Sequence, residues 1–242
     1  MERHAAADPA AGLFLAEREG VLTLTDGVLS LCADFAPLLR RIRPNALRGE
    51  LLVRAAKAKD LGPRPTACDM TAGFGEDSFL LAAAGFSVTL FENDPVIFDL
   101  LADAHRRAKE ARVGEDAGPG AEEAGGMLLF ETASRMTPVF GDSIEKVRDL
   151  APPPDIILLD PMFPERTKSG LVGKKFQLLQ KLERPCADGE ALLAAALSVR
   201  PKRIIIKRPV KGPYLGGRRP DFSYTGKTVR WDVVLPYYTR IS

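Results

Sequence analysis

The most informative part of the sequence is residues 66–85, TACDMTAGFGEDSFLLAAAG. Residues 66–70 are typical of a buried strand, residues 71–75 contain two glycines, and residues 77–84 have the composition of a helix. Glycines between a strand and a helix let the backbone approach a ligand closely at the helix N-terminus. This stretch therefore predicts a strand, a ligand-binding loop that includes Gly73 and Gly75, and a helix.

The residues around this stretch continue the alternation of helices and strands. We expect a first helix from residue 51 to about residue 61. Strands are expected at residues 86–91, 137–140, 155–159, 203–207 and 231–237, and helices at residues 95–112, 143–150, 174–182 and 189–199. Such alternation is typical of a parallel, doubly wound sheet, whose ligands bind at the carboxyl ends of the strands.

The N-terminal part has a different pattern. Residues 12–35 contain short apolar runs separated by Glu19-Gly20 and Asp26-Gly27, and Asp-Gly is a strong signal for a β-hairpin. We expect residues 1–45 to form a small antiparallel β meander and residues 46–242 to form the main α/β domain. Residues 115–126, EDAGPGAEEAGG, are acidic and glycine-rich without apolar anchors, so they predict a surface loop.

Composition and cysteine spacing disfavour several classes of protein. The 242 residues are 45% hydrophobic and 27% charged, which suits a globular protein with one large domain. Cys32, Cys68 and Cys186 lie far apart and only two histidines are present, so we expect neither a metal site nor a disulfide framework. No apolar run approaches about 18 residues, the length of a membrane span. We interpret the protein as cytoplasmic, and nothing in the sequence indicates its oligomeric state.

Acidic side chains follow the glycine loop. A dinucleotide-binding loop would have a third glycine where Ser78 stands, and Glu76 and Asp77 beside it would repel a pyrophosphate. These carboxylates suit a ligand that carries an ammonium and a sulfonium group, which points to S-adenosylmethionine (SAM). Glu92 ends the second strand about 20 residues later, where a carboxylate accepts hydrogen bonds from ribose hydroxyls.

Two more polar residues, Asp142 and Ser143, follow the third expected strand. They are placed either to contact the adenine edge of the ligand or to cap the next helix, and the sequence leaves both roles open.

The segment Asp160-Pro161-Met162-Phe163-Pro164 follows the apolar strand at residues 155–159. Methyl transfer to an exocyclic base amine needs acceptors for its two N–H groups, because its lone pair is delocalised into the ring. The Asp160 carboxylate and the Pro161 carbonyl are suited to that task, and Phe163 offers a surface on which a base stacks. The segment therefore predicts methylation of a nucleobase amine, with a strand-ending turn around a buried Phe as the alternative.

With these motifs, the chain resembles the bacterial ribosomal small-subunit methyltransferase J family. The matching stretches are residues 48–50, 69–77, 92–95, 160–164 with Lys168-Ser169 shortly after, and 207–209. The resemblance implies a Rossmann-like, class I SAM-dependent methyltransferase with a mostly parallel sheet. It also implies methylation of the N2 amine of a guanosine in 16S rRNA of the small ribosomal subunit. The cofactor contacts that it implies fall on Glu76, Asp77, Glu92, Asn93, Asp142, Ser143 and Asp160, to which the loop itself adds Asp69, Gly73 and Gly75.

Charge is unevenly distributed along the chain, although the net charge is only +2. Residues 1–159 carry 17 basic and 25 acidic side chains, whereas residues 160–242 carry 17 basic and 7 acidic ones. Residues 200–219 contain eight basic residues and no acidic one, so we expect them to contact phosphates around the target base. Lys168, Lys207 and Arg208 are the candidate RNA contacts, with a solvated charged surface as the alternative.

Three other functions stay open at this point. The first is an amino-methyltransferase of DNA or of another RNA, acting on adenine N6 or cytosine N4. The second is a nicotinamide-dependent dehydrogenase, which Ser78 and the absence of a suitably placed His or Tyr disfavour. The third is an RNA-binding domain without catalytic activity.

Overall fold

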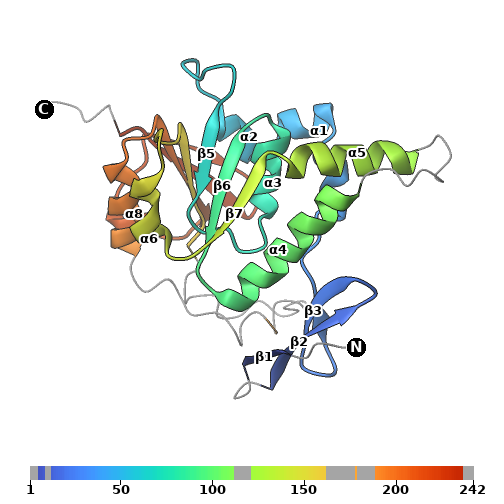
Figure 1. The fold of residues 1–242 in the computed structure, drawn as a ribbon. Coiled ribbons are helices and arrows are strands. Elements are labelled where there is room, and N and C mark those ends of the chain that lie inside the picture. Colours follow the sequence, from blue (N-terminus) through green and yellow to red (C-terminus); the bar gives the residue numbers. More distant parts are fainter. Residues whose placement is uncertain (1–4, 9–11, 112–120, 162–177, 179–188, 237–242) are drawn as a thin grey trace, which may run out of the picture.

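The computed structural model describes residues 5–8, 12–111, 121–161, 178 and 189–236 (Figure 1). Its larger sheet consists of β5 (Thr66–Asp69), β6 (Ser87–Glu92), β7 (Met136–Phe140), β8 (Ile156–Leu159), β9 (Arg203–Pro209), β10 (Phe222–Thr225) and β11 (Val229–Val234). The strand order is β10-β11-β9-β8-β5-β6-β7. Strands β9, β8, β5, β6 and β7 are parallel, and β11 is antiparallel to both of its neighbours. The predicted mostly parallel sheet is confirmed.

The order of the strands places a switch point beside β5. The chain runs from β5 to β6 and β7 on one side and then returns to β8 on the other side. The loops that follow β5 and β8 therefore diverge at the carboxyl edge of the sheet, where parallel α/β sheets bind ligands.

Helices cover both faces of this sheet (Figure 1). One face packs against α2 (Leu51–Ala56), α3 (Glu76–Ala83), α4 (Pro95–Glu110) and α5 (Ala121–Ala133), and the other against α6 (Ser143–Lys146) and α8 (Gly189–Ser198). Along β8, Ile156 and Leu158 face the first set while Ile157 and Leu159 face the second. All four side chains are fully buried, which explains why this strand is a continuous apolar run.

The N-terminal strands form a separate four-stranded antiparallel sheet beside α4 (Figure 1). They are β1 (Ala5–Asp8), β2 (Leu13–Arg18), β3 (Val21–Thr25) and β4 (Ser30–Leu31). In the hairpin between β3 and β4, the Asp26 carboxylate accepts hydrogen bonds from the amides of Val28 and Leu29. The predicted meander is therefore confirmed as a fold element.

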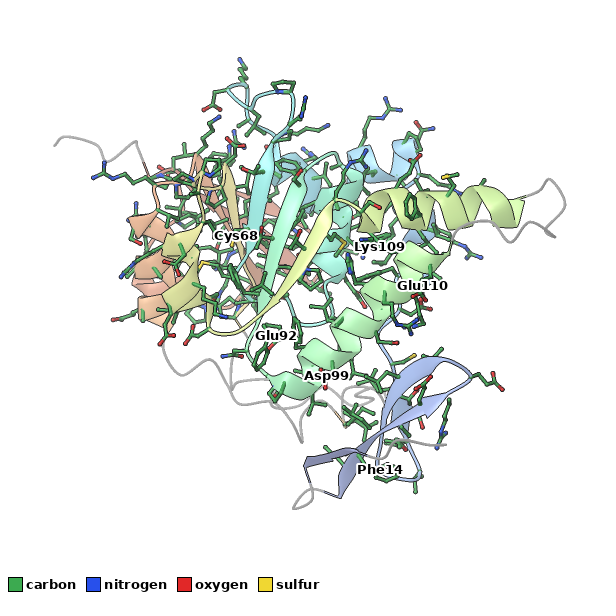
Figure 2. All side chains as sticks on the ribbon, viewed as in Figure 1. Phe14, Cys68, Glu92, Asp99, Lys109 and Glu110 are labelled. Atoms are coloured by element: carbon green, nitrogen blue, oxygen red, sulfur yellow. The ribbon has the colours of Figure 1, made fainter. Side chains whose placement is uncertain are left out.

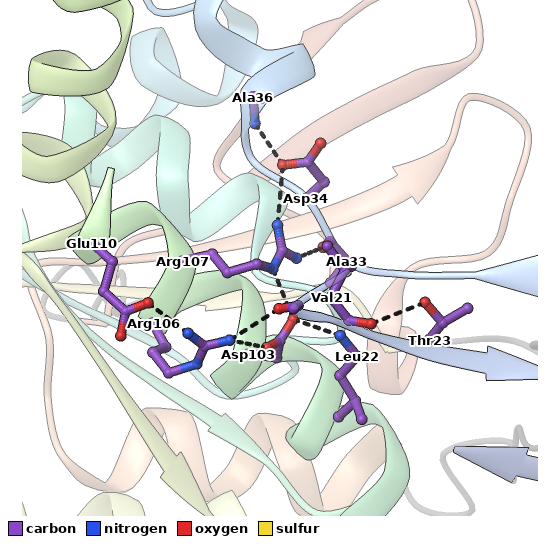
Figure 3. Close-up of polar contacts among 11 residues, drawn as sticks. Val21, Leu22, Thr23, Ala33, Asp34, Ala36, Asp103, Arg106, Arg107 and Glu110 are labelled. Atoms are coloured by element: carbon purple, nitrogen blue, oxygen red, sulfur yellow. Dashed lines mark hydrogen bonds and ion pairs between the residues drawn. The ribbon is translucent and has the colours of Figure 1, made fainter. Parts of the chain in front are cut away.

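A polar cluster on α4 fastens this sheet to the rest of the molecule (Figure 3). Asp103 accepts a 3.2 Å hydrogen bond from the amide of Leu22 and forms ion pairs of 2.7 Å with Arg106 and 2.8 Å with Arg107. Arg107 also donates to the carbonyl of Ala33. The leucines of the meander belong to the same apolar core as α2, α3 and α4, so one core spans the expected boundary between residues 45 and 46.

Short helices connect these elements. A 3-10 helix at Ala36–Arg40 and α1 (Pro44–Gly49) join the meander to α2. Further 3-10 helices at Val147–Asp149 and Leu215–Gly217 follow α6 and β9.

Three expectations about local structure need correction. The helix that was expected to end near residue 61 ends at Ala56. Residues 121–126 begin α5 instead of forming a surface loop, because alanine and glutamate favour helices and the partly buried Leu128 and Leu129 anchor the helix to the core. The edge strand β10 was not expected, since its alternation of aromatic and polar residues extends over only four positions, most of them exposed. Of the expected helix at residues 174–182, only position 178 is among the described residues.

Candidate functional site

The loop between β5 and α3 lies at the carboxyl edge of the sheet. Gly73 and Gly75 have φ values of +54° and +75°, in the left-handed region that favours glycine. A Cβ atom on Gly75 would lie 2.8 Å from the Cδ1 atom of Leu101, whereas a Cβ atom on Gly73 would meet no described atom within 4 Å. Packing beneath the loop therefore requires glycine at position 75, and Gly73 leaves room for a ligand to approach the backbone.

Asp69 connects this loop to the segment that follows β8. Its buried carboxylate accepts a 2.7 Å hydrogen bond from the hydroxyl of Ser78 and a 3.0 Å hydrogen bond from the amide of Thr71. The hydroxyl of Thr71 in turn accepts a 2.6 Å hydrogen bond from the amide of Asp160. Burial raises the pKa of Asp69 to about 7. Both oxygens of Asp69 are engaged inside the protein, so this residue shapes the site, and its predicted contact with SAM stays a prediction.

Glu92 lies at the end of β6, beside the glycine loop (Figure 2). One carboxylate oxygen accepts a 2.9 Å hydrogen bond from the amide of Gly73, and the other accepts 2.9 Å hydrogen bonds from the amides of Asn93 and Asp94. Burial raises the pKa of Glu92, although these three hydrogen bonds oppose the rise. The direct link to Gly73 brings together two of the residues that the sequence singled out.

Asp142 and Ser143 hold the loop that follows β7. The carboxylate of Asp142 accepts a 2.8 Å hydrogen bond from the amide of Ile144 and so caps α6, which confirms the capping alternative. The buried hydroxyl of Ser143 donates a 2.8 Å hydrogen bond to the carbonyl of Met70. Ser143 thus ties this loop to the glycine loop, and contact of either residue with adenine stays a prediction.

Lys207 lies at the site, as the sequence indicated, but its partners are two carboxylates that the sequence did not assign to it. Its ammonium nitrogen lies 2.6 Å from a carboxylate oxygen of Asp77 and 3.0 Å from a carboxylate oxygen of Asp160. The two carboxylates raise the pKa of Lys207 against the opposing effect of burial. Lys207 was predicted to contact phosphate, but its surroundings are those of an ammonium shared between two acidic site residues.

Arg41 is a neighbour of the site that sequence reasoning missed. It forms a bidentate ion pair with Glu50, at 2.7 and 2.9 Å, and Glu50 belongs to the Arg48-Gly49-Glu50 stretch. The pKa of Arg41 is raised mainly by the hydrogen bond with Glu50, and the fields of Asp77 and Glu76 add to the rise. Glu50 is therefore held by Arg41, whose charge also interacts with Asp77 and Glu76 at the start of α3.

The segment after β8 is described only in part. Asp160 and the buried Pro161 follow the strand at the carboxyl edge. Phe163 and Lys168 lie in the part of the chain that the structure does not describe, so their predicted roles stay predictions.

The basic residues at 200–219 do not gather at one edge of the sheet. Lys202 and Arg203 lie at the amino end of β9, opposite the site, where Lys202 pairs with Asp155 at 2.9 Å. A seven-residue strand spans roughly 20 Å, so the two ends of β9 face different edges. The expectation that the whole run surrounds the target base is wrong.

Arg208 is also placed differently from the expectation. Its side chain is 1% exposed, and its Nε atom donates a 2.7 Å hydrogen bond to the carbonyl of Pro213. Burial, together with the charge of Arg230 directly opposite on β11, lowers the pKa of Arg208 to about 10. This burial disagrees with the surface position that a phosphate contact requires.

Three further observations concern the described residues alone. None of their His, Cys, Asp and Glu side chains form a group of three or more that could hold a metal ion. No helix among them is long and apolar enough to cross a membrane. Cys68 is fully buried, and this burial raises the pKa of its thiol.

Comparisons with known proteins agree with this geometry. Residues 9–236 match a family described as "Putative SAM-dependent methyltransferase". The ribosomal RNA small subunit methyltransferase J of Neisseria meningitidis serogroup C is 39% identical, over 93% of this chain and 84% of the relative. The protein of the same name from Thioalkalivibrio sulfidiphilus is 42% identical, over 78% of this chain and 68% of the relative.

Solved structures show the same fold. The crystal structure of a SAM-dependent methyltransferase from Neisseria gonorrhoeae has a TM-score of 0.66 and 31% identity, and the match covers 94% of this chain and 84% of that one. The rRNA methyltransferase AviRa from Streptomyces viridochromogenes has a TM-score of 0.50 and 17% identity, over 80% of this chain and 85% of that one, and shows the fold alone.

Proposed function

The chain belongs to the ribosomal RNA small subunit methyltransferase J family of SAM-dependent methyltransferases, and on this basis we propose which reaction it performs. We propose that it transfers a methyl group from SAM to the exocyclic N2 amine of a guanosine in 16S rRNA. One observation carries this proposal. Hydrogen bonds join Gly73 to Glu92, and join Asp160 through Thr71 to Asp69, and this connection supports a single site for the cofactor and the amine.

The described residues fit SAM. Gly73 leaves open space above a backbone with positive φ, which suits close approach of a ligand. The carboxylate of Glu92 next to it is suited to the ribose hydroxyls, and Asp77 in the first turn of α3 is suited to an ammonium group. Asn93, Asp142 and Ser143 border the same loops on the side of β7. When bound, SAM supplies a methyl group that is already activated, so no nucleophilic side chain is required.

The residues that follow β8 are suited to receive the target amine. The Asp160 carboxylate and the Pro161 carbonyl accept hydrogen bonds from its two N–H groups and favour the geometry in which its lone pair attacks. The amide of Asp160 is fixed on Thr71, which keeps the backbone of this segment in place. Phe163 is the proposed stacking surface for the base, and Lys168 is the proposed phosphate contact. We place the reaction in the cytoplasm, with 16S rRNA or the small ribosomal subunit as the partner.

A transfer assay with several nucleic acids tests this proposal. The purified protein is incubated with radiolabelled SAM and, in parallel, with unmethylated small ribosomal subunits, tRNA and duplex DNA. We expect label in 16S rRNA alone. Label in DNA or tRNA would favour the alternative amino-methyltransferase.

A pair of variants shows whether Asp160 takes part. Asp160→Asn should retain the fold by circular dichroism and lose at least about 100-fold in rate, a typical cost of removing one electrostatic group from an active site. Asp149→Asn, at an exposed position at the end of the 3-10 helix that follows α6, is the matched control and should keep the rate of the unmodified protein. Near-normal turnover by Asp160→Asn would overturn the assignment of Asp160.

A further inference from the structure

We propose that Lys207 is a positioning residue, which holds the carboxylates of Asp77 and Asp160 in the arrangement that methyl transfer requires. This inference rests on the proposed function. It differs from the phosphate contact that the sequence predicted for Lys207, and the two roles lead to different experimental results.

Lys207 joins three separate elements of the fold. It lies on β9, Asp77 lies in the first turn of α3, and Asp160 follows β8. Its ammonium nitrogen is 2.6 Å from Asp77 and 3.0 Å from Asp160, both distances of charge-assisted hydrogen bonds. In the proposed site, Asp77 serves the methyl donor and Asp160 serves the acceptor amine. Lys207 thus connects the two halves of the site directly.

The position of the ammonium group is itself fixed by its neighbours. Trp231 is directly opposite Lys207 in the antiparallel pairing of β9 and β11, and the ammonium nitrogen lies 5.4 Å from the centre of its ring. Only 27% of the Lys207 side chain is exposed. A cation that is half-buried and already paired with two anions contributes little positive potential at the surface, which disfavours phosphate binding as its main role.

The charges around Lys207 explain why its removal would matter. Asp77 and Asp160 share one cation, so without it two neighbouring carboxylates would repel each other and one would bind a proton more readily. The nearby Asp69 feels the negative charge of both. Two other cations interact with these carboxylates, since Asp160 acts to raise the pKa of Arg208, and Asp77 and Glu76 act to raise that of Arg41. A protonated Asp160 offers fewer acceptor sites to the amine, so the reaction depends on the charge of Lys207.

The test compares Lys207→Met, which removes the charge, with Lys207→Arg, which keeps it. The turnover number and the KM for small ribosomal subunits are measured from about pH 5.5 to pH 9. This range shows at which acidic pH the turnover number begins to fall. We expect Lys207→Met to lose about 100-fold in turnover at pH 7 with little change in KM. The acidic pH at which the turnover number of Lys207→Met falls should be higher than in the unmodified protein by about one unit or more. Lys207→Arg should restore part of the rate. A raised KM with unchanged turnover and pH profile would show a phosphate contact and overturn the proposal.

Lys109→Met is the matched control, because Lys109 is exposed near the end of α4 that points away from Glu92 (Figure 2). It should leave turnover and the pH profile unchanged. If the unmodified protein shows no methyl transfer to any nucleic acid, the proposed function fails, and the stability measurement alone then tests how Lys207 acts on the two carboxylates.

The stability measurement does not depend on activity. The free energy of unfolding is measured by urea at several pH values for the unmodified protein and for Lys207→Met, or for Lys207→Gln where the Met variant does not fold. Without the ammonium, the folded state binds protons at the carboxylate pair more tightly than the unfolded state does. The stability deficit of the variant should therefore shrink as the pH falls from 7 towards 4. A deficit that is independent of pH would contradict the proposal.

Discussion

Separate replacement of Gly73 and Gly75 by alanine should distinguish the contribution of the glycine loop to folding from its contribution to SAM binding. Both glycines have positive φ, which costs an L-residue about 1–2 kcal/mol. At Gly75 the new Cβ atom would also lie 2.8 Å from the Cδ1 atom of Leu101 and 3.2 Å from that of Leu90. Both leucines are fully buried, and overpacking of this kind costs about 1–3 kcal/mol.

The two variants should therefore behave differently. We expect Gly75→Ala to lose about 2–5 kcal/mol of unfolding free energy and Gly73→Ala about 1–2 kcal/mol, each measured by urea unfolding followed by circular dichroism. Gly73→Ala should weaken SAM binding at least about tenfold in calorimetric titration at a temperature where the variant is folded, because its methyl group fills the space left for the ligand. If Gly73→Ala binds SAM as tightly as the unmodified protein, the loop is not the cofactor site. If Gly75→Ala is as stable as the unmodified protein, the packing argument is wrong.

Three further predictions concern stability and are all measured by urea unfolding. His105 is held neutral by burial, which lowers its pKa, so the free energy of unfolding should fall as the pH drops below about 6.5, and His105→Gln should reduce this dependence. Asp103→Asn weakens the acceptor of the Leu22 amide and removes the charge that orients Arg107 towards the Ala33 carbonyl, and we expect a loss of about 1–3 kcal/mol and faster proteolysis within residues 12–31. Ser78→Ala removes a donor from the buried carboxylate of Asp69 and should cost about 1–3 kcal/mol; an unchanged stability would contradict the role given to this hydrogen bond.

The central sheet and the glycine loop could be predicted because their signals are local. The run of four apolar residues in β8 and the glycines between β5 and α3 each lie within a short stretch of sequence. The alternation of these segments then predicts a parallel sheet, whose carboxyl edge collects the loops that follow the strands. The proximity of Glu92 to the glycine loop follows from this topology alone.

The role of Lys207 could not be predicted because it depends on contacts between distant residues. Lys207 is 130 positions from Asp77, and only the strand order brings them together. The sequence also shows Lys207 and Arg208 as one basic pair, although successive residues of a strand point to opposite faces. Lys207 therefore reaches the site, while Arg208 is buried beside Arg230.

Identification of the modified nucleoside tests the central claim most directly. Unmethylated small ribosomal subunits are incubated with SAM and the protein, and their 16S rRNA is digested to nucleosides for mass spectrometry. We predict N2-methylguanosine as the product, and its absence when SAM is omitted or Asp160→Asn is used. The account would be contradicted by N6-methyladenosine, by N4-methylcytosine, or by no methylated nucleoside from a folded protein that binds SAM.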